Sequence, residues 1–153
     1  MYDNGIKESN ISTMDARNEI ALIYFKPLKQ YNGRRQFRVA LPKLTSSLMY
    51  ELIGSENDIE KSKLWLEMGD HNRDNIFETK LPYFNSETQS YVLHFSEFIQ
   101  WTSIKNFQLI DQNSDTIFLE FGKMNKNEFL LRFRHPFSIL NAFGIALAIF
   151  DKT

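Results

Sequence analysis

The sequence contains no cysteine, and this absence excludes several kinds of site. It rules out a disulfide framework, a thiolate metal site and a cysteine nucleophile, and it is typical of intracellular proteins. No apolar run reaches the roughly 20 residues that a membrane-spanning helix needs. The first ten residues are polar, unlike a secretory signal. We therefore expect a cytoplasmic protein without a transmembrane segment.

Signatures of catalysis are also missing. The sequence has no G-x-S-x-G, no P-loop, no Rossmann glycine fingerprint and no H-E-x-x-H. Its three histidines, His71, His94 and His135, stand far apart and lack the spacing of metal ligands. We predict that His94 is a partly buried packing residue in a strand. We expect neither an enzyme nor a metal or other cofactor.

One stretch lacks acidic residues altogether. Between Ile20 and Tyr50 there is no Asp or Glu, and the six basic residues there are Lys26, Lys29, Arg34, Arg35, Arg38 and Lys43. The other 12 basic and 19 acidic residues give the remainder a charge of −7, which hides this +6 patch within a total of −1. Such a patch suggests an anionic partner. The alternative is a solvated hairpin that happens to be basic, and composition alone favours that alternative.

Aromatic residues are abundant, with 14 Phe, 6 Tyr and 2 Trp among 153 residues. This composition suits sheets packed on a core, and the chain is long enough for one domain. Strands are predicted at Glu19–Lys26 and Arg34–Leu41, joined by a type I′ turn at Asn32-Gly33. In the second strand, alternation places Phe37 inward, and Arg35 begins the same row where it can still reach solvent.

Further strands are predicted in the second half of the chain. They cover Ile76–Lys80, Ser90–Phe95, Ile104–Ile110, Thr116–Phe121 and Glu128–Arg134. Turns are predicted at Pro82 and Asn85-Ser86, and a hairpin loop at Gly122–Asn127. For residues 46–70 we predict a loop with room for one helical turn, then a strand, because Leu64 and Met68 belong to an alternating apolar pattern.

A short apolar helix is predicted over residues 136–151. Between Phe137 and Phe150 only Ser138, Asn141 and Gly144 interrupt the apolar residues. A helix that is apolar on nearly every side must be enclosed, and the roughly 21 Å from Phe137 to Phe150 is shorter than a bilayer core of about 30 Å. Pro136 suits its first turn. We therefore expect a central helix enclosed by strands.

Four segments of this sequence resemble motifs of the tubby C-terminal domain, and they occur in the family's order. They are Tyr2–Gly5, Thr88–Leu93, Ser103–Gln108 (Ser-Ile-Lys-Asn-Phe-Gln) and Pro136–Asp151. The third is similar to the family's Ser-Val-Lys-Asn-Phe-Gln, which follows a Phe here matched by Phe95. The fourth is similar to its closing helix, Pro-Leu-x-x-Leu-Gln-Ala-Phe-Ala-Ile-x-Leu-Ser-Ser-Phe-Asp.

The resemblance implies an α+β, mainly β fold: a β-barrel threaded by its C-terminal helix. It covers only the later part of a family domain, so we expect residues 1–153 to form a single partial domain with an incomplete barrel, in which residues 1–17 are irregular. An incomplete barrel would expose strand edges and part of the helix, and self-association through those edges is expected.

The resemblance also implies binding to phosphoinositides, especially phosphatidylinositol 4,5-bisphosphate, at the cytosolic face of the plasma membrane. The Arg of the family's Gly-Pro-Arg-Lys hairpin matches Arg35, whose guanidinium would grip phosphate bidentately. Arg34 replaces the family's Pro and Gln36 its Lys, while other basic positions of the family's pocket lie upstream of the matched motifs. The predicted phosphoinositide-binding residues are Arg35, Arg34, Lys29 and Arg38.

Family resemblance further implies a membrane-tethered adaptor with signalling or ciliary trafficking partners. One alternative is a nucleus-located, transcription-associated protein, although no groove-reading motif accompanies the basic hairpin, which disfavours nucleic acid as a partner. Another is a truncated fragment without specific lipid binding. A relationship to phospholipid scramblases, which share the barrel-and-helix plan, is disfavoured by the missing cysteines and the missing basic extension after the helix.

Overall fold

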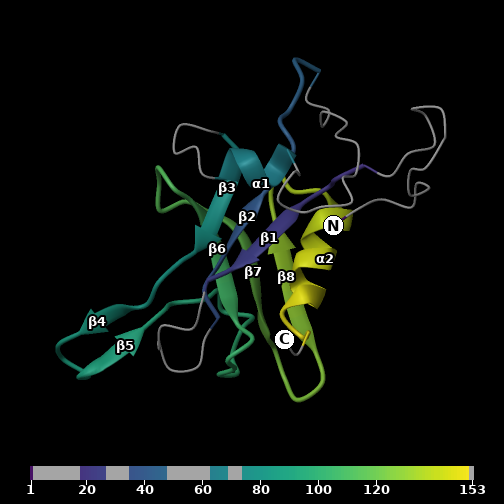
Figure 1. Cartoon of the computed structure of the whole chain (residues 1–153). Helices are drawn as coiled ribbons and strands as arrows, with labels where there is room; N and C mark the ends of the chain where they lie inside the picture. Colours follow the sequence, from purple (N-terminus) through teal and green to yellow (C-terminus); the bar gives the residue numbers. More distant parts are fainter. Residues whose placement is uncertain (2–17, 27–34, 48–62, 69–73, 152–153) are drawn as a thin grey trace. The chain divides into compact units, whose positions relative to one another are not determined.

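The computed structural model describes residues 1, 18–26, 35–47, 63–68 and 74–151 (Figure 1). Within these residues the chain forms eight strands and two helices. In chain order they are β1 (Leu22–Phe25), β2 (Phe37–Ala40), α1 (Lys63–Met68), β3 (Ile76–Thr79), β4 (Tyr83–Asn85), β5 (Ser90–Val92), β6 (Phe107–Asp111), β7 (Ile117–Lys123), β8 (Phe129–Phe133) and α2 (Ile139–Ala148).

Six strands form one sheet in the order β1-β2-β3-β6-β7-β8, and β4 and β5 form a separate hairpin. In the part of the chain that the structure describes, the sheet begins at β1, ends at β8 and does not close. The predicted fold class is confirmed: the protein is mainly β, with a C-terminal helix and an incomplete barrel.

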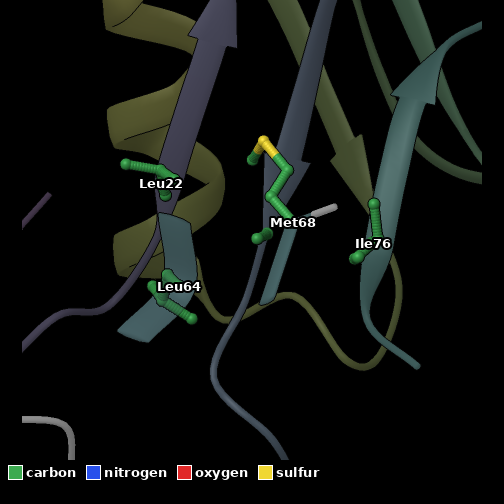
Figure 2. Packing of buried hydrophobic residues seen from close by; sticks show 5 residues of the cluster. Leu22, Leu64, Met68 and Ile76 are labelled. Carbon is green, nitrogen blue, oxygen red and sulfur yellow. The ribbon is translucent and has the colours of Figure 1, made fainter. Parts of the chain in front are cut away.

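The chain divides into two compact units, Met1–Tyr24 with Arg38–Phe77 and Phe25–Phe37 with Glu78–Thr153. The first unit has a small apolar core drawn from β1, β2, α1 and β3 (Figure 2). Its buried members are Leu22, Ala40, Leu64, Met68 and Ile76. The rings of Tyr24 and Trp65 pack against this core and meet edge to face, with centroids 5.6 Å apart.

The predicted strand at Leu64–Met68 is wrong, because these residues lie in α1. Leu64 and Met68 are four residues apart, so on a helix both side chains lie on one face, and both are buried. Their spacing fits a helix as well as a strand. Only the core on which they pack distinguishes the two.

In the second unit, β6, β7 and β8 form an antiparallel sheet whose two faces differ. One face carries the apolar pairs of the register, Phe107 opposite Phe121 and Leu109 opposite Leu119. The rings of Phe121 and Phe129 are stacked with centroids 5.2 Å apart, and both meet Phe150 edge to face. This face therefore packs against the end of the C-terminal helical segment, and we call it the helix face.

On the opposite face, which we call the outer face, polar residues meet across the strands. Gln108 pairs with Glu120, and Glu120 pairs with Arg132. The chain segment 94–101 crosses this face: Ser96 N–H donates to the Glu120 carboxylate at 3.0 Å. Ile99 packs on Gly122, where an added Cβ would lie only 2.5 Å from its Cγ2 atom. The close approach explains a glycine within a strand.

Helix α2 lies beside β8, and it begins later than predicted. Ser138 is its N-cap and forms a capping box with Asn141: Ser138 N–H donates to Asn141 Oδ1 at 2.8 Å, and Asn141 N–H donates to Ser138 Oγ at 3.4 Å. Pro136 therefore precedes the helix instead of lying in its first turn.

One side of α2 is buried and the other is open. The buried residues of the helix are Asn141, Ala142, Ile145 and Ala146. The large apolar side chains on its open side, from 53% to 77% exposed, belong to Ile139, Leu140, Phe143 and Leu147. Among the described residues, the expected enclosure of the helix on all sides is thus absent, whereas the expected exposure of part of the helix in an incomplete barrel is confirmed.

The other strand predictions hold, with shorter or shifted ends. The turn predicted between β3 and β5 contains an additional short strand, β4. It pairs with β5, with Tyr83 opposite Val92 and Asn85 opposite Ser90. Strand β7 continues to Lys123, so Gly122 belongs to the strand and not to the hairpin loop. The predicted turn at Asn32-Gly33 lies outside the described residues.

Candidate functional site

The basic hairpin predicted from the sequence can be followed at its two ends, which belong to the second compact unit. Strand β1 ends at Phe25, and β2 begins at Phe37. The Lys26 N–H donates to the Gln36 carbonyl oxygen at 2.8 Å, which joins the two chain segments directly beyond the strands. This pairing fixes the position of Arg35 relative to the end of β1.

Arg35 is half-buried, and its guanidinium lies over the ring of Phe25, with the central carbon 5.4 Å from the ring centroid. Phe25 meets Phe37 at 5.4 Å, and Phe37 meets Phe107 at 5.0 Å. Arg35 thus stands at the end of a row of rings that leads into the sheet. An aromatic ring holds a guanidinium by its face, whereas the N–H edge is the part that recognises phosphate.

The neighbouring lysine is neutralised by an acidic partner from another strand. Lys26 Nζ lies 3.5 Å from Glu78 Oε2, with side chains 35% and 30% exposed. Lys80, just beyond β3, makes a similar ion pair with Asp115 at 3.7 Å. The six basic residues of the acid-free window are therefore not all uncompensated, because Glu78 of β3 forms an ion pair with Lys26.

The structure describes two of the four predicted site residues. Arg35 has the surroundings given above. Arg38 lies in β2, is half-buried and belongs to the first compact unit. Arg34 and Lys29 lie outside the described residues. Arg35 is therefore the predicted residue around which a candidate site can be built.

Two residues that influence this site were not identified from the sequence. Phe25 was assigned only to a strand, although its position at the strand end, opposite a returning basic residue, is a usable signal for a cation–π pair. No feature of the sequence around Glu78 predicts its ion pair with Lys26, because that pair depends on which strands become neighbours in the sheet.

The described histidines do not form a metal site. His94 lies just past β5 and is exposed, so the predicted partly buried strand position is wrong. Its Nε2 is 2.7 Å from the Tyr83 hydroxyl, a contact across the β4–β5 hairpin. Among the described residues, no group of three or more His, Asp or Glu is placed to hold a metal ion.

Neither of the two helices among the described residues is both long and apolar enough to cross a bilayer.

Comparison with known proteins gives consistent matches across the chain. The model of the Tub family matches residues 2–152. Protein king tubby of Drosophila melanogaster is 36% identical over 157 residues, which cover 99% of this chain and 33% of that protein. Protein king tubby 2 of Culex quinquefasciatus is 36% identical over 155 residues, covering 99% of this chain and 36% of that protein. The chain thus spans about a third of the length of these curated relatives.

Proposed function

Because this chain belongs to the Tub family, we propose that it is a phosphoinositide-binding module that tethers a protein to a membrane surface. Its ligand in this proposal is phosphatidylinositol 4,5-bisphosphate at the cytosolic face of the plasma membrane. The chain would act as one partial tubby domain, without catalytic activity.

The observation that carries the proposal is the placement of Arg35 over Phe25. A long, flexible arginine normally loses up to ~2 kcal/mol of rotamer entropy when it is held in one position. Packing against Phe25 restricts the side chain before any ligand arrives, so less of this cost falls on binding. The N–H fork of arginine matches two oxygens of a phosphate group, which a lysine cannot do.

The wider role is that of an adaptor. Membrane binding through this module would hold signalling or ciliary cargo proteins near the membrane, and the cilium and the nucleus are further candidate locations. These features belong to whole family proteins, and this chain spans about a third of the relatives' length. They therefore form part of the proposal and depend on segments beyond the lipid site.

Diffuse attraction to an acidic membrane is the main competing explanation for binding. Each basic residue near such a surface contributes about 1 kcal/mol, and salt weakens this contribution. The ion pair between Lys26 and Glu78 lowers the charge available for such attraction. Selective binding must therefore come from geometry at Arg35 more than from total charge.

The test is co-sedimentation with liposomes that contain or lack phosphatidylinositol 4,5-bisphosphate, at near-physiological salt. Arg35→Ala and Arg35→Lys should both lose selective binding, because the lysine keeps the charge but not the fork. Phe25→Ala keeps the arginine but removes the ring beneath it, and it should weaken selective binding several-fold. Lys126→Ala, which removes one charge from an exposed hairpin loop, is the matched control and should bind normally.

Equal binding to any acidic liposome, with no difference between Arg35→Ala and Lys126→Ala, would instead support diffuse attraction. Binding of duplex DNA by the same protein, without lipid selectivity, would favour the nucleic-acid alternative. Absence of all binding by a cooperatively folding chain would support a fragment without specific lipid binding.

A further inference from the structure

A hollow of about 180 Å³ lies in the second compact unit, at the end of the β7–β8 pair. It is formed by Ile117–Glu120 of β7 and by Arg132–Arg134 at the end of β8. Arg132 pairs with Glu120 in the strand register, and the Arg134 N–H donates to the Phe118 carbonyl oxygen at 2.9 Å. Because side chains alternate along strands, both arginines and the Phe118 side chain lie on the outer face, away from the helix face.

The guanidinium of Arg132 forms an ion pair with a buried carboxylate. Its Nη2 lies 3.3 Å from Glu120 Oε2, and the Glu120 side chain is only 2% exposed. The other oxygen, Oε1, accepts from Ser96 N–H at 3.0 Å and from Gln108 Nε2 at 2.8 Å. Arg132 itself is 57% exposed, so only part of its guanidinium is occupied by Glu120. A guanidinium has five N–H donors.

Arg134 is held by an aromatic ring. Its guanidinium carbon lies 5.8 Å from the Phe118 ring centroid, and the residue is exposed. Among the residues that the structure describes, no carboxylate forms an ion pair with Arg134. The two arginines and Glu120 together give the lining of the hollow a net charge of +1.

We propose that this hollow is an anion site whose ligand is a phosphomonoester. Arg132 lies in β8 and Arg134 directly follows the strand, so two steps of extended chain separate their Cα atoms by roughly 6.6 Å. Two guanidinium forks at this separation can hold opposite oxygens of one tetrahedral phosphate, whereas a planar carboxylate is satisfied by a single fork. A phosphomonoester carries a charge of about −1.5 to −2, opposite in sign to the net +1 of the lining.

This site is separate from Arg35 and does not rest on the proposed function. The phosphate could be free in solution or could belong to a lipid headgroup, and both sources present the same oxygens to the arginines. The experiment therefore measures the two sources separately.

The first arm is an NMR titration of the ¹⁵N-labelled chain with inorganic phosphate. We expect saturable shifts at the amides of Phe118, Phe133 and Arg134. Arg134→Gln should weaken this binding about tenfold, since it removes one of the two forks. Glu120→Gln keeps an acceptor for Ser96 and Gln108 but raises the charge of the lining from +1 to +2, and it should bind phosphate several-fold more tightly. Lys126→Gln is the matched control for loss of one positive charge and should bind normally.

The second arm uses vesicles containing phosphatidylinositol 4,5-bisphosphate and compares Arg134→Gln with Lys126→Gln, both with the natural Arg35. A loss of binding in Arg134→Gln alone would place a lipid headgroup in the hollow. If inorganic phosphate shifts the amide signals but Arg134→Gln causes no such loss of vesicle binding, the ligands of the hollow are free phosphomonoesters. The proposal is overturned if phosphate causes no saturable shifts at the hollow, if Lys126→Gln weakens binding as much as Arg134→Gln, or if Glu120→Gln leaves the affinity unchanged.

Discussion

Glu120 and Arg132 face each other across β7 and β8 on the outer face of the sheet, with Oε2 and Nη2 3.3 Å apart. The carboxylate is buried and the guanidinium is more than half exposed. Glu120 also receives hydrogen bonds from Ser96 and Gln108, so it joins the segment that crosses the outer face to two neighbouring strands. A single buried charge thereby organises this face of the second unit.

Loss of Arg132 should destabilise the fold more than loss of an ordinary exposed arginine. Arg132→Ala leaves the buried Glu120 carboxylate without its ion-pair partner, and we expect a decrease of about 1–2 kcal/mol in the free energy of unfolding. In the Glu120→Gln background, Arg132→Ala should lower the free energy of unfolding by less. The difference gives a coupling of about 0.5–1.5 kcal/mol in a double-mutant cycle. Urea unfolding of the four proteins measures it, and additive effects would contradict the pairing.

Gly122 should not tolerate even one methyl group. An added Cβ would lie 2.5 Å from Cγ2 and 2.7 Å from Cδ1 of Ile99, so Gly122→Ala should lower the free energy of unfolding by about 1–3 kcal/mol. Ile99→Ala makes room for that Cβ. In this background Gly122→Ala should be nearly neutral, and thermal unfolding of the single and double variants checks the difference. An equal loss in both backgrounds would point to a backbone cause instead.

The N-cap of α2 offers a test of the helix boundary. Ser138→Ala removes the hydroxyl that accepts from the Asn141 N–H, and it should cost about 1 kcal/mol of stability. Ser138→Asp keeps an acceptor and should retain most of the stability. If both variants unfold at the same urea concentration, Ser138 is not the cap.

The open side of α2 should promote self-association. Phe143→Gln replaces a side chain that is 54% exposed, and it should reduce concentration-dependent association in sedimentation velocity while leaving stability within about 1 kcal/mol. Ile145→Ala on the buried side is the contrast. Ile145 is fully buried, and its truncation should cost about 2–5 kcal/mol. Unchanged association in Phe143→Gln would show that this side does not self-associate.

Strands were predicted well wherever alternation or an aromatic run extended over several residues. Phe37 and Val39 are buried as the alternation required, and the strands around Leu109 and Leu119 lie where predicted. Three-residue β4 was missed because a strand so short has too few residues to show a period. At the candidate site, Arg35 could be singled out through its family motif, whereas Phe25 beneath it could not.

The sequence by itself determined that this is a mainly β chain of the Tub family, with a basic hairpin and an apolar C-terminal helix, because motifs and side-chain periods are local properties of the chain. The tertiary structure alone decided that Leu64 and Met68 form a helix, that Glu78 neutralises Lys26, and that Arg132 and Arg134 share a hollow with a buried Glu120. It also decided which side of α2 is covered. A helix that is apolar all round carries no mark of its buried side, and burial depends on which strands are present to pack against it.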